Sequence, residues 1–205
     1  MRMLERVILH GGPSDSQQAR WELRSAVSLW CCLFLLIFAV VVGRATGAAL
    51  FLNHYGGREL ALVYVLVGLA VVAIIYGLSW LTHGVRYHRV AIGTIVTLAI
   101  GTAAFRWIIW ATQPDEQRWV YGALYVFVET FALVTTMQVW SLANSSFSLA
   151  QAKRLYVFVA TGGIVGSVCG GWVTRSLATW NALDLLWIVV ALCPPMVVEI
   201  GRAHV

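Results

Sequence analysis

Six long apolar segments constrain this chain more than any other feature of its sequence. They cover residues 25–51, 60–82, 89–111, 119–143, 154–177 and 181–198. The hydrocarbon core of a bilayer is about 30 Å thick, and a helix needs about 20 residues to cross it. Every segment is long enough, although the sixth is close to the lower limit. The segments are too continuously apolar, and too rich in Gly and Ala, for the alternating strands of a barrel. We therefore predict an all-α integral membrane protein with six transmembrane helices.

The composition supports this class and excludes several others. Hydrophobic residues make up 60% of the chain and charged residues 11%, whereas a soluble domain is about half apolar and about a quarter charged. The four cysteines lie within apolar runs and lack CxxC spacing, so we predict neither a disulfide framework nor a metal site. No cofactor motif is present. The basic residues lie mostly near the ends of apolar runs, which suits lipid head groups and indicates no nucleic-acid partner.

The polar ends of the chain define the expected domain boundaries. Residues 1–24 are polar and of mixed charge, without the apolar core of a signal peptide, so we predict a retained cytoplasmic tail. The six-helix bundle then occupies residues 25–198. Residues 199–205, EIGRAHV, correspond to the translated start of a common sequencing adapter. We predict that they are a read-through artefact and that the gene continues; a short cytoplasmic tail is the alternative.

The distribution of Lys and Arg predicts the orientation of the bundle. If the N-terminus is cytoplasmic, the inside segments carry Arg2, Arg6, Arg20, Arg24, Arg86, Arg89, Lys153 and Arg154. The outside loops then carry only Arg58, Arg118 and Arg175. This asymmetry predicts a multi-pass protein of the cell (inner) membrane with a cytoplasmic N-terminus. Lys153 and Arg154 act as the topology anchor between the fourth and fifth helices.

Three ionisable residues lie inside the predicted spans: Arg44, Arg106 and Glu129. A charged side chain at the centre of a membrane helix costs about 2.5–3.5 kcal/mol on insertion scales. One interpretation is that the three residues line a substrate cavity, where the planar guanidinium groups bind phosphate or carboxylate. The other is that Glu129, near the midplane, forms a buried ion pair with Arg106 or Arg44 that only locks helices together. The sequence leaves both open.

Glycines repeat every four residues on the fifth segment, at Gly162, Gly166 and Gly170. Residues at this spacing share one helix face. Small side chains on one face let two membrane helices approach closely. The face serves either static packing or the sliding of helices during transport. A phosphate-binding loop is not indicated, because no GK[ST] follows.

One stretch, Trp140 to Gly171, resembles a known family. It contains an aromatic-x-x-A-N start (Trp140–Asn144), an A-K-R-L entry (Ala152–Leu155) and a glycine-rich helix (Gly162–Gly171). These features resemble the ATP/ADP translocase-like branch of the major facilitator superfamily. The resemblance implies a fold of two six-helix halves, of which this chain supplies the N-terminal one and lacks its C-terminal partner. It also implies alternating access for a small, anionic or nucleotide-like solute.

The leading hypothesis is therefore a fragment of a secondary-active transporter, with Arg44, Arg106 and Glu129 as substrate-binding residues. The alternative is a non-transporting membrane scaffold or sensor on the same fold. A membrane enzyme is disfavoured, because the sequence has no HExxH motif and no paired acids on one helix.

Overall fold

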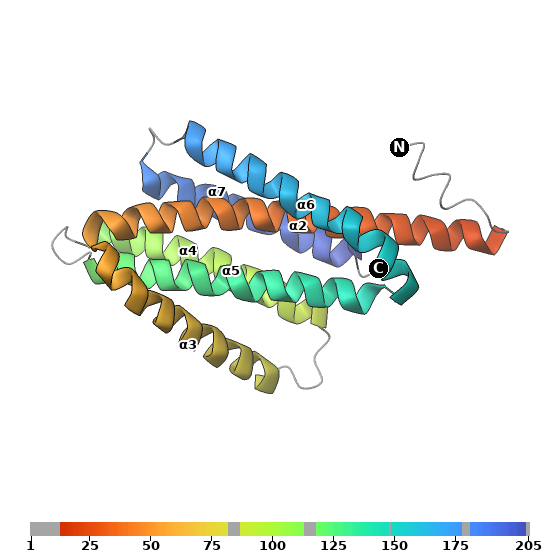
Figure 1. Ribbon diagram of the computed structural model, residues 1–205, viewed down its shortest axis with the longest axis horizontal. Coiled ribbons are helices and arrows are strands. Elements are labelled where there is room, and N and C mark those ends of the chain that lie inside the picture. The colour runs from red at the N-terminus through yellow and green to blue at the C-terminus, as the bar shows by residue number, and fades with distance from the viewer. Residues whose placement is uncertain (1–12, 82–86, 113–117, 148, 178–180, 204–205) are drawn as a thin grey trace.

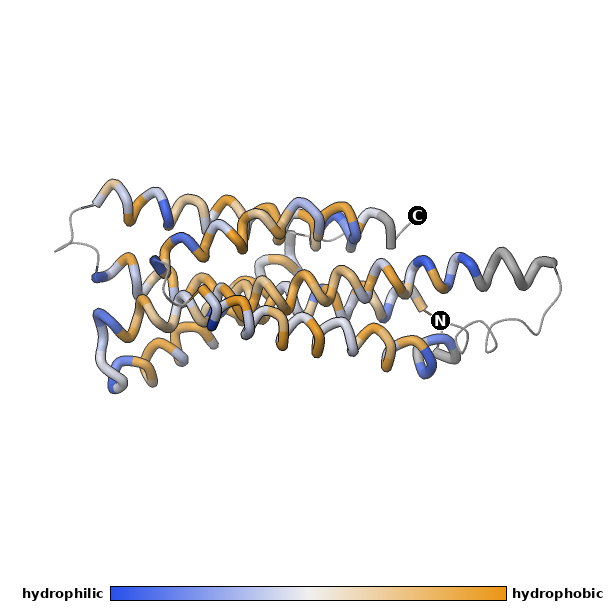
Figure 2. Tube along the Cα trace, turned by 90° about the horizontal axis from the view of Figure 1, so that it is seen from above, coloured by the Kyte–Doolittle hydropathy of each residue, from blue (hydrophilic) through white to orange (hydrophobic). Residues whose placement is uncertain are grey.

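The computed structural model describes residues 13–81, 87–112, 118–147, 149–177 and 181–203 (Figure 1). The helices in these ranges are α2 (Pro13–His54), α3 (Gly57–Leu81), α4 (Tyr87–Ala111), α5 (Arg118–Ser146), α6 (Leu149–Ser176) and α7 (Ala182–Ala203). All six are long and apolar enough to cross a membrane, and the described residues form no strand. The predicted all-α, six-span class is thus confirmed. In Figure 2 apolar residues predominate along the lengths of the helices, and polar residues gather toward their ends.

The first and last helices extend further than the apolar runs that predicted them. Helix α2 begins at Pro13, and its first turns project beyond the other helices (Figure 1). The reason is that residues 14–24 contain no Gly or Pro and include good helix formers such as Gln, Ala, Glu and Arg. Helix α7 likewise continues to Ala203. Residues 1–12 and 204–205 lie outside the described ranges.

The helices form two layers. Helix α2 packs against α5, α6 and α7; α5 also packs against α3 and α4; and α4 packs against α7. The order α3, α5, α2, α6 therefore defines one layer, which Figure 1 shows with α4 and α7 behind it. We call it the front layer and its outward side the front face. Fully buried side chains such as Leu29, Leu36, Leu142 and Met196 form the core where α2, α5 and α7 meet.

The packing pairs repeat between the two halves of the chain. Exchanging α2, α3 and α4 for α5, α6 and α7 turns the α2–α6 pair into the α5–α3 pair. The same exchange turns the α2–α7 pair into the α5–α4 pair and leaves α2–α5 and α4–α7 unchanged. Helices α2 and α5 run in opposite directions (Figure 1). The fold thus consists of two three-helix units of inverted orientation.

Helices α2 and α6 approach each other most closely along a row that we call the glycine seam. It consists of Gly162, Gly166 and Gly170 on α6 and Trp30, Phe34 and Phe38 on α2. A Cβ atom added to each of these glycines would lie within 3.0 Å of the carbonyl oxygen of the facing residue on α2. Real Cβ atoms essentially never make contacts as short as those at Gly162 and Gly166, and the 3.0 Å contact at Gly170 is tighter than nine in ten real ones. The structure therefore allows only glycine at these positions without a shift of one helix.

Candidate functional site

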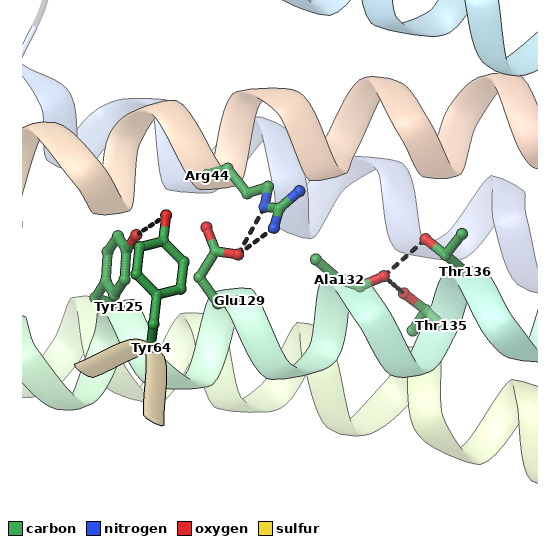
Figure 3. Close-up of polar contacts among 7 residues, drawn as sticks. All are labelled: Arg44, Tyr64, Tyr125, Glu129, Ala132, Thr135 and Thr136. Atoms are coloured by element: carbon green, nitrogen blue, oxygen red, sulfur yellow. Dashed lines mark hydrogen bonds and ion pairs between the residues drawn. The ribbon is translucent and has the colours of Figure 1, made fainter. Parts of the chain in front are cut away.

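An ion pair between Arg44 and Glu129 lies between the two central helices of the front layer (Figure 3). Arg44 is on α2 and Glu129 is on α5. Arg44 Nε donates a hydrogen bond to Glu129 Oε2 at 2.8 Å, and Arg44 Nη2 donates to the same oxygen. Of the two arginines that could neutralise Glu129, the structure uses Arg44.

The two partners are unequally covered by protein. The Glu129 side chain is 6% exposed, whereas the Arg44 side chain is 44% exposed. A buried carboxylate without a partner is strongly destabilising, and the pair removes that cost. The guanidinium has five N–H donors, and its contacts in the described chain all go to one carboxylate oxygen. Arg44 therefore keeps N–H groups on the front face that can donate hydrogen bonds to an anion.

Two tyrosines extend this polar patch toward α3. Tyr125 lies on α5 four residues before Glu129, and its hydroxyl donates to the Tyr64 hydroxyl of α3 at 3.2 Å (Figure 3). The two rings meet edge to face, with centroids 6.3 Å apart. Tyr64 is half exposed, while Tyr125 is buried. Sequence reasoning missed both, although the four-residue spacing of Tyr125 and Glu129 places them on one helix face.

Arg106 lies elsewhere. It is on α4 in the rear layer, and its Nη2 donates to Asp184 Oδ1 of α7 at 3.4 Å. No contact in the described ranges joins Arg106 to Arg44 or Glu129. Arg44, Arg106 and Glu129 thus belong to two separate pairs, each of which joins one arginine to one carboxylate. Any preference for an anion must therefore come from the uncovered donors of Arg44 and not from an excess of arginines.

The stretch that resembles a known family forms the corner between α5 and α6. The Tyr156 hydroxyl donates to Asn144 Oδ1 at 2.5 Å, and the Tyr156 ring packs edge to face against Trp140. Lys153 and Arg154 are exposed in the first turns of α6. Among the described residues, no hydrogen bond or ion pair joins this corner to the Arg44–Glu129 pair. It joins two helices and does not form part of the site.

The described residues offer no obvious place for a metal ion. They contain no group of three or more His, Cys, Asp or Glu side chains that could hold one. None of the four cysteines forms a disulfide, and Cys32 and Cys193 are buried.

Comparison with known proteins gives one partial likeness. No family model matches the chain, and no solved structure matches it. A segment of 68 residues is 32% identical to the ADP,ATP carrier protein 3 of Rickettsia bellii (strain RML369-C). The match covers 33% of this chain and only 13% of the carrier. The chain is thus a six-helix protein of the membrane type with one segment similar to a carrier protein.

Proposed function

We propose that this chain is the N-terminal six-helix half of a secondary-active transporter of the major facilitator type, in the ATP/ADP translocase-like branch. The partial likeness to a carrier supports this proposal. The inverted three-helix units support it as well, because such units are nested within each half of these transporters. The front face, with α3, α5, α2 and α6, is then the side that meets the second half.

The observation that carries the proposal is the half-exposed guanidinium of Arg44 in the middle of the front face. Its planar fork can donate two parallel hydrogen bonds to a phosphate or carboxylate. Glu129 holds the guanidinium in place from the protein side. The Tyr64 hydroxyl, which accepts a hydrogen bond from Tyr125, lies on the same patch and keeps its own proton to donate to a substrate. The substrate is then a small anionic, nucleotide-like solute that binds between the two halves, and the site opens alternately to each side of the membrane.

A transport assay with three variants tests this assignment. Proteoliposomes that contain the chain are supplied with radiolabelled ADP and, separately, with inorganic phosphate. Losing a hydrogen bond to a charged group costs about 1.5–3 kcal/mol, so we expect Arg44→Gln to reduce uptake about tenfold or more. We expect Glu129→Gln to reduce uptake as well, because the guanidinium loses its anchor. Arg106→Gln is the matched control, since Arg106 contacts Asp184 and not the pair.

A binding measurement covers the case in which uptake needs the second half of the transporter. We expect ADP to raise the unfolding temperature of the purified chain and Arg44→Gln to abolish that rise. Equal stabilisation of the wild type, Arg44→Gln and Arg106→Gln would remove Arg44 from the site.

The orientation of the chain belongs to the same proposal, with the N-terminus in the cytoplasm and the chain in the inner membrane. Lys153 is the only lysine in the sequence, and it is exposed at the start of α6. An amine-reactive reagent that cannot cross membranes should label Lys153 in inside-out vesicles and not in right-side-out vesicles. The Lys153→Arg variant shows how much of the label is on the N-terminal α-amino group. Labelling of Lys153 in right-side-out vesicles alone would contradict the proposed orientation.

The alternative function is a non-transporting scaffold or sensor, and the ion pair itself favours it, because Arg44 already satisfies Glu129. In that case neither ADP nor phosphate is moved or bound. The Arg44 and Glu129 variants would then change stability alone.

A further inference from the structure

A concave feature beside α3 plays no part in the proposed transport site. It is a groove of about 660 Å³ between α3 and α5. Its wall is formed by Leu62, Leu66, Ala70 and Ile74 of α3, and its floor includes Phe127 and Phe131 of α5. Leu62 and Tyr64 are two residues apart, which is about 200° around a helix. The groove therefore opens away from the face that carries Tyr64 and the Arg44–Glu129 pair.

The groove has the length and lining of a site for an acyl chain. Glu59 and Ile74 both line it, and they are 15 positions apart, which corresponds to about 22 Å of helix. Half of the hydrocarbon core of a bilayer is about 15 Å. The groove thus runs from one end of the bundle past the middle of the membrane. Between these ends the α3 wall is a continuous apolar stripe at four-residue spacing, formed by Leu62, Leu66 and Ala70.

The mouth of the groove carries groups of opposite charge on the two helices. Tyr55, Glu59 and Trp119 line it, and Trp is typical of the membrane–water interface. The Arg118 guanidinium of α5 lies 4.8 Å from the centre of the Tyr55 ring. Glu59 of α3 makes no ion pair with a described residue. A carboxylate and a guanidinium at one mouth complement a head group that has both an ammonium and a phosphate.

We propose that this groove binds one molecule of a zwitterionic phospholipid, with an acyl chain along α3 and the head group between Glu59 and Arg118. The carboxylate of Glu59 binds the ammonium, and the guanidinium of Arg118 binds the phosphate. The lipid fills the space between α3 and the rest of the bundle. This site is independent of the proposed transport function, since it shares no residue with the Arg44–Glu129 patch.

One polar atom deep in the groove provides a way to distinguish a bound lipid from a polar ligand. Thr130 lines the groove, its side chain is buried, and its Oγ1 has no hydrogen-bond partner. An acyl chain makes no use of that hydroxyl, whereas a polar solute at this depth would bind it. Labelling by lipid should therefore survive Thr130→Val.

The test uses the full chain in vesicles that contain phosphatidylethanolamine with a photoreactive group in its acyl chain. We expect labelling of the groove peptides of α3 and α5. Leu66→Trp fills the groove and should reduce that labelling about fivefold or more. Leu69→Trp is the matched control, because Leu69 is a large exposed residue of the same helix that does not line the groove. Ala70→Leu fills the groove at a second position if the tryptophan variant does not fold.

The role of the head group is tested with phosphatidylglycerol, which carries the same photoreactive acyl chain but has no ammonium in its head group. Wild-type protein should label more strongly with phosphatidylethanolamine, and Glu59→Gln should remove that preference. Equal labelling in Leu66→Trp and Leu69→Trp would show ordinary boundary lipid and overturn the proposal. A loss of labelling in Thr130→Val would also overturn it, in favour of an occupant that binds the hydroxyl.

Discussion

Helices α6 and α3 occupy equivalent places in the two three-helix units, yet they are held in different ways. Helix α6 packs on α2 through the glycine seam, where backbone lies against backbone. Helix α3 packs on α5, but its glycines at Gly68 and Gly77 have no atom within 4 Å of an added Cβ. Only 11% of the span of α3 is buried within the protein. Glycine thus permits close packing only where its row faces a partner helix.

Helix α3 is instead held near its first turns by aromatic side chains. Phe51 of α2 is fully buried, and its ring lies 4.6 Å from that of Tyr55 and 5.0 Å from that of Tyr125. Val63 and Val67 of α3 pack against this cluster. Toward its C-terminal end α3 diverges from the bundle (Figure 1). The structure therefore has one tightly packed edge, α6, and one loosely packed edge, α3.

The largest expected effect comes from breaking the tight edge. Gly166→Leu places a side chain against the carbonyl of Phe34, and we expect a loss of about 3 kcal/mol or more, since overpacking forces the backbone to move. Gly171→Leu is the control on the same helix, because a Cβ there meets nothing within 4 Å. Thermal unfolding in detergent measures both. Similar unfolding temperatures for the two variants would show that the seam does not hold α6.

The next largest effect concerns the centre of the front layer, between the two edges. A double-mutant cycle of Arg44→Gln and Glu129→Gln should give a coupling free energy of about 1–3 kcal/mol, less than a fully buried pair because Arg44 is half exposed. The same cycle on Arg106 and Asp184 should give less than about 1 kcal/mol, because that contact is longer and the Asp184 carboxylate is half exposed. Equal coupling in the two cycles would contradict this ranking.

A smaller effect tests the attachment of the loose edge. Tyr125→Phe removes the hydroxyl bond to Tyr64, and we expect a loss of about 0.5–1.5 kcal/mol. Amide hydrogen exchange should increase in α3 and remain unchanged in α6. Tyr64→Phe leaves Tyr125 without its acceptor and should have a similar effect. An increase in exchange spread evenly over the six helices would show that the bond does not serve α3 in particular.

The smallest effect has the opposite sign. Gly68→Ala should stabilise the protein by up to about 1 kcal/mol, because alanine favours the helix and meets no other atom. Gly162→Ala, which makes the same chemical change at the seam, should destabilise it. The difference between the two unfolding temperatures measures what the seam contributes. A Gly162→Ala variant as stable as Gly68→Ala would show that α2 moves aside at little cost.

The fold class and the number of spans could be predicted because both depend on local hydropathy and segment length. The ends of α2 could not, since residues 13–24 are polar and only their helix propensity indicates the extension. Arg44 and Glu129 could be selected because charge inside a span is costly. The partner of Glu129 could not be assigned, because either Arg44 or Arg106 could lie beside it in a six-helix bundle. Asp184, near the start of α7, is the partner of Arg106, and no pattern in the sequence selected it for that contact.

The sequence by itself determined that the chain is a six-helix membrane protein, and it determined which residues carry charge into the spans. The order of residues along each segment is sufficient for these conclusions, because hydropathy and helical spacing are local properties. Only the tertiary structure decided that Arg44 neutralises Glu129, that Tyr64 and Tyr125 extend the patch, and that α6 is tightly held while α3 is not. Those properties depend on which helix faces of distant segments meet, and a single segment, even one with a glycine row, does not specify the partner that lies 60 to 130 residues away.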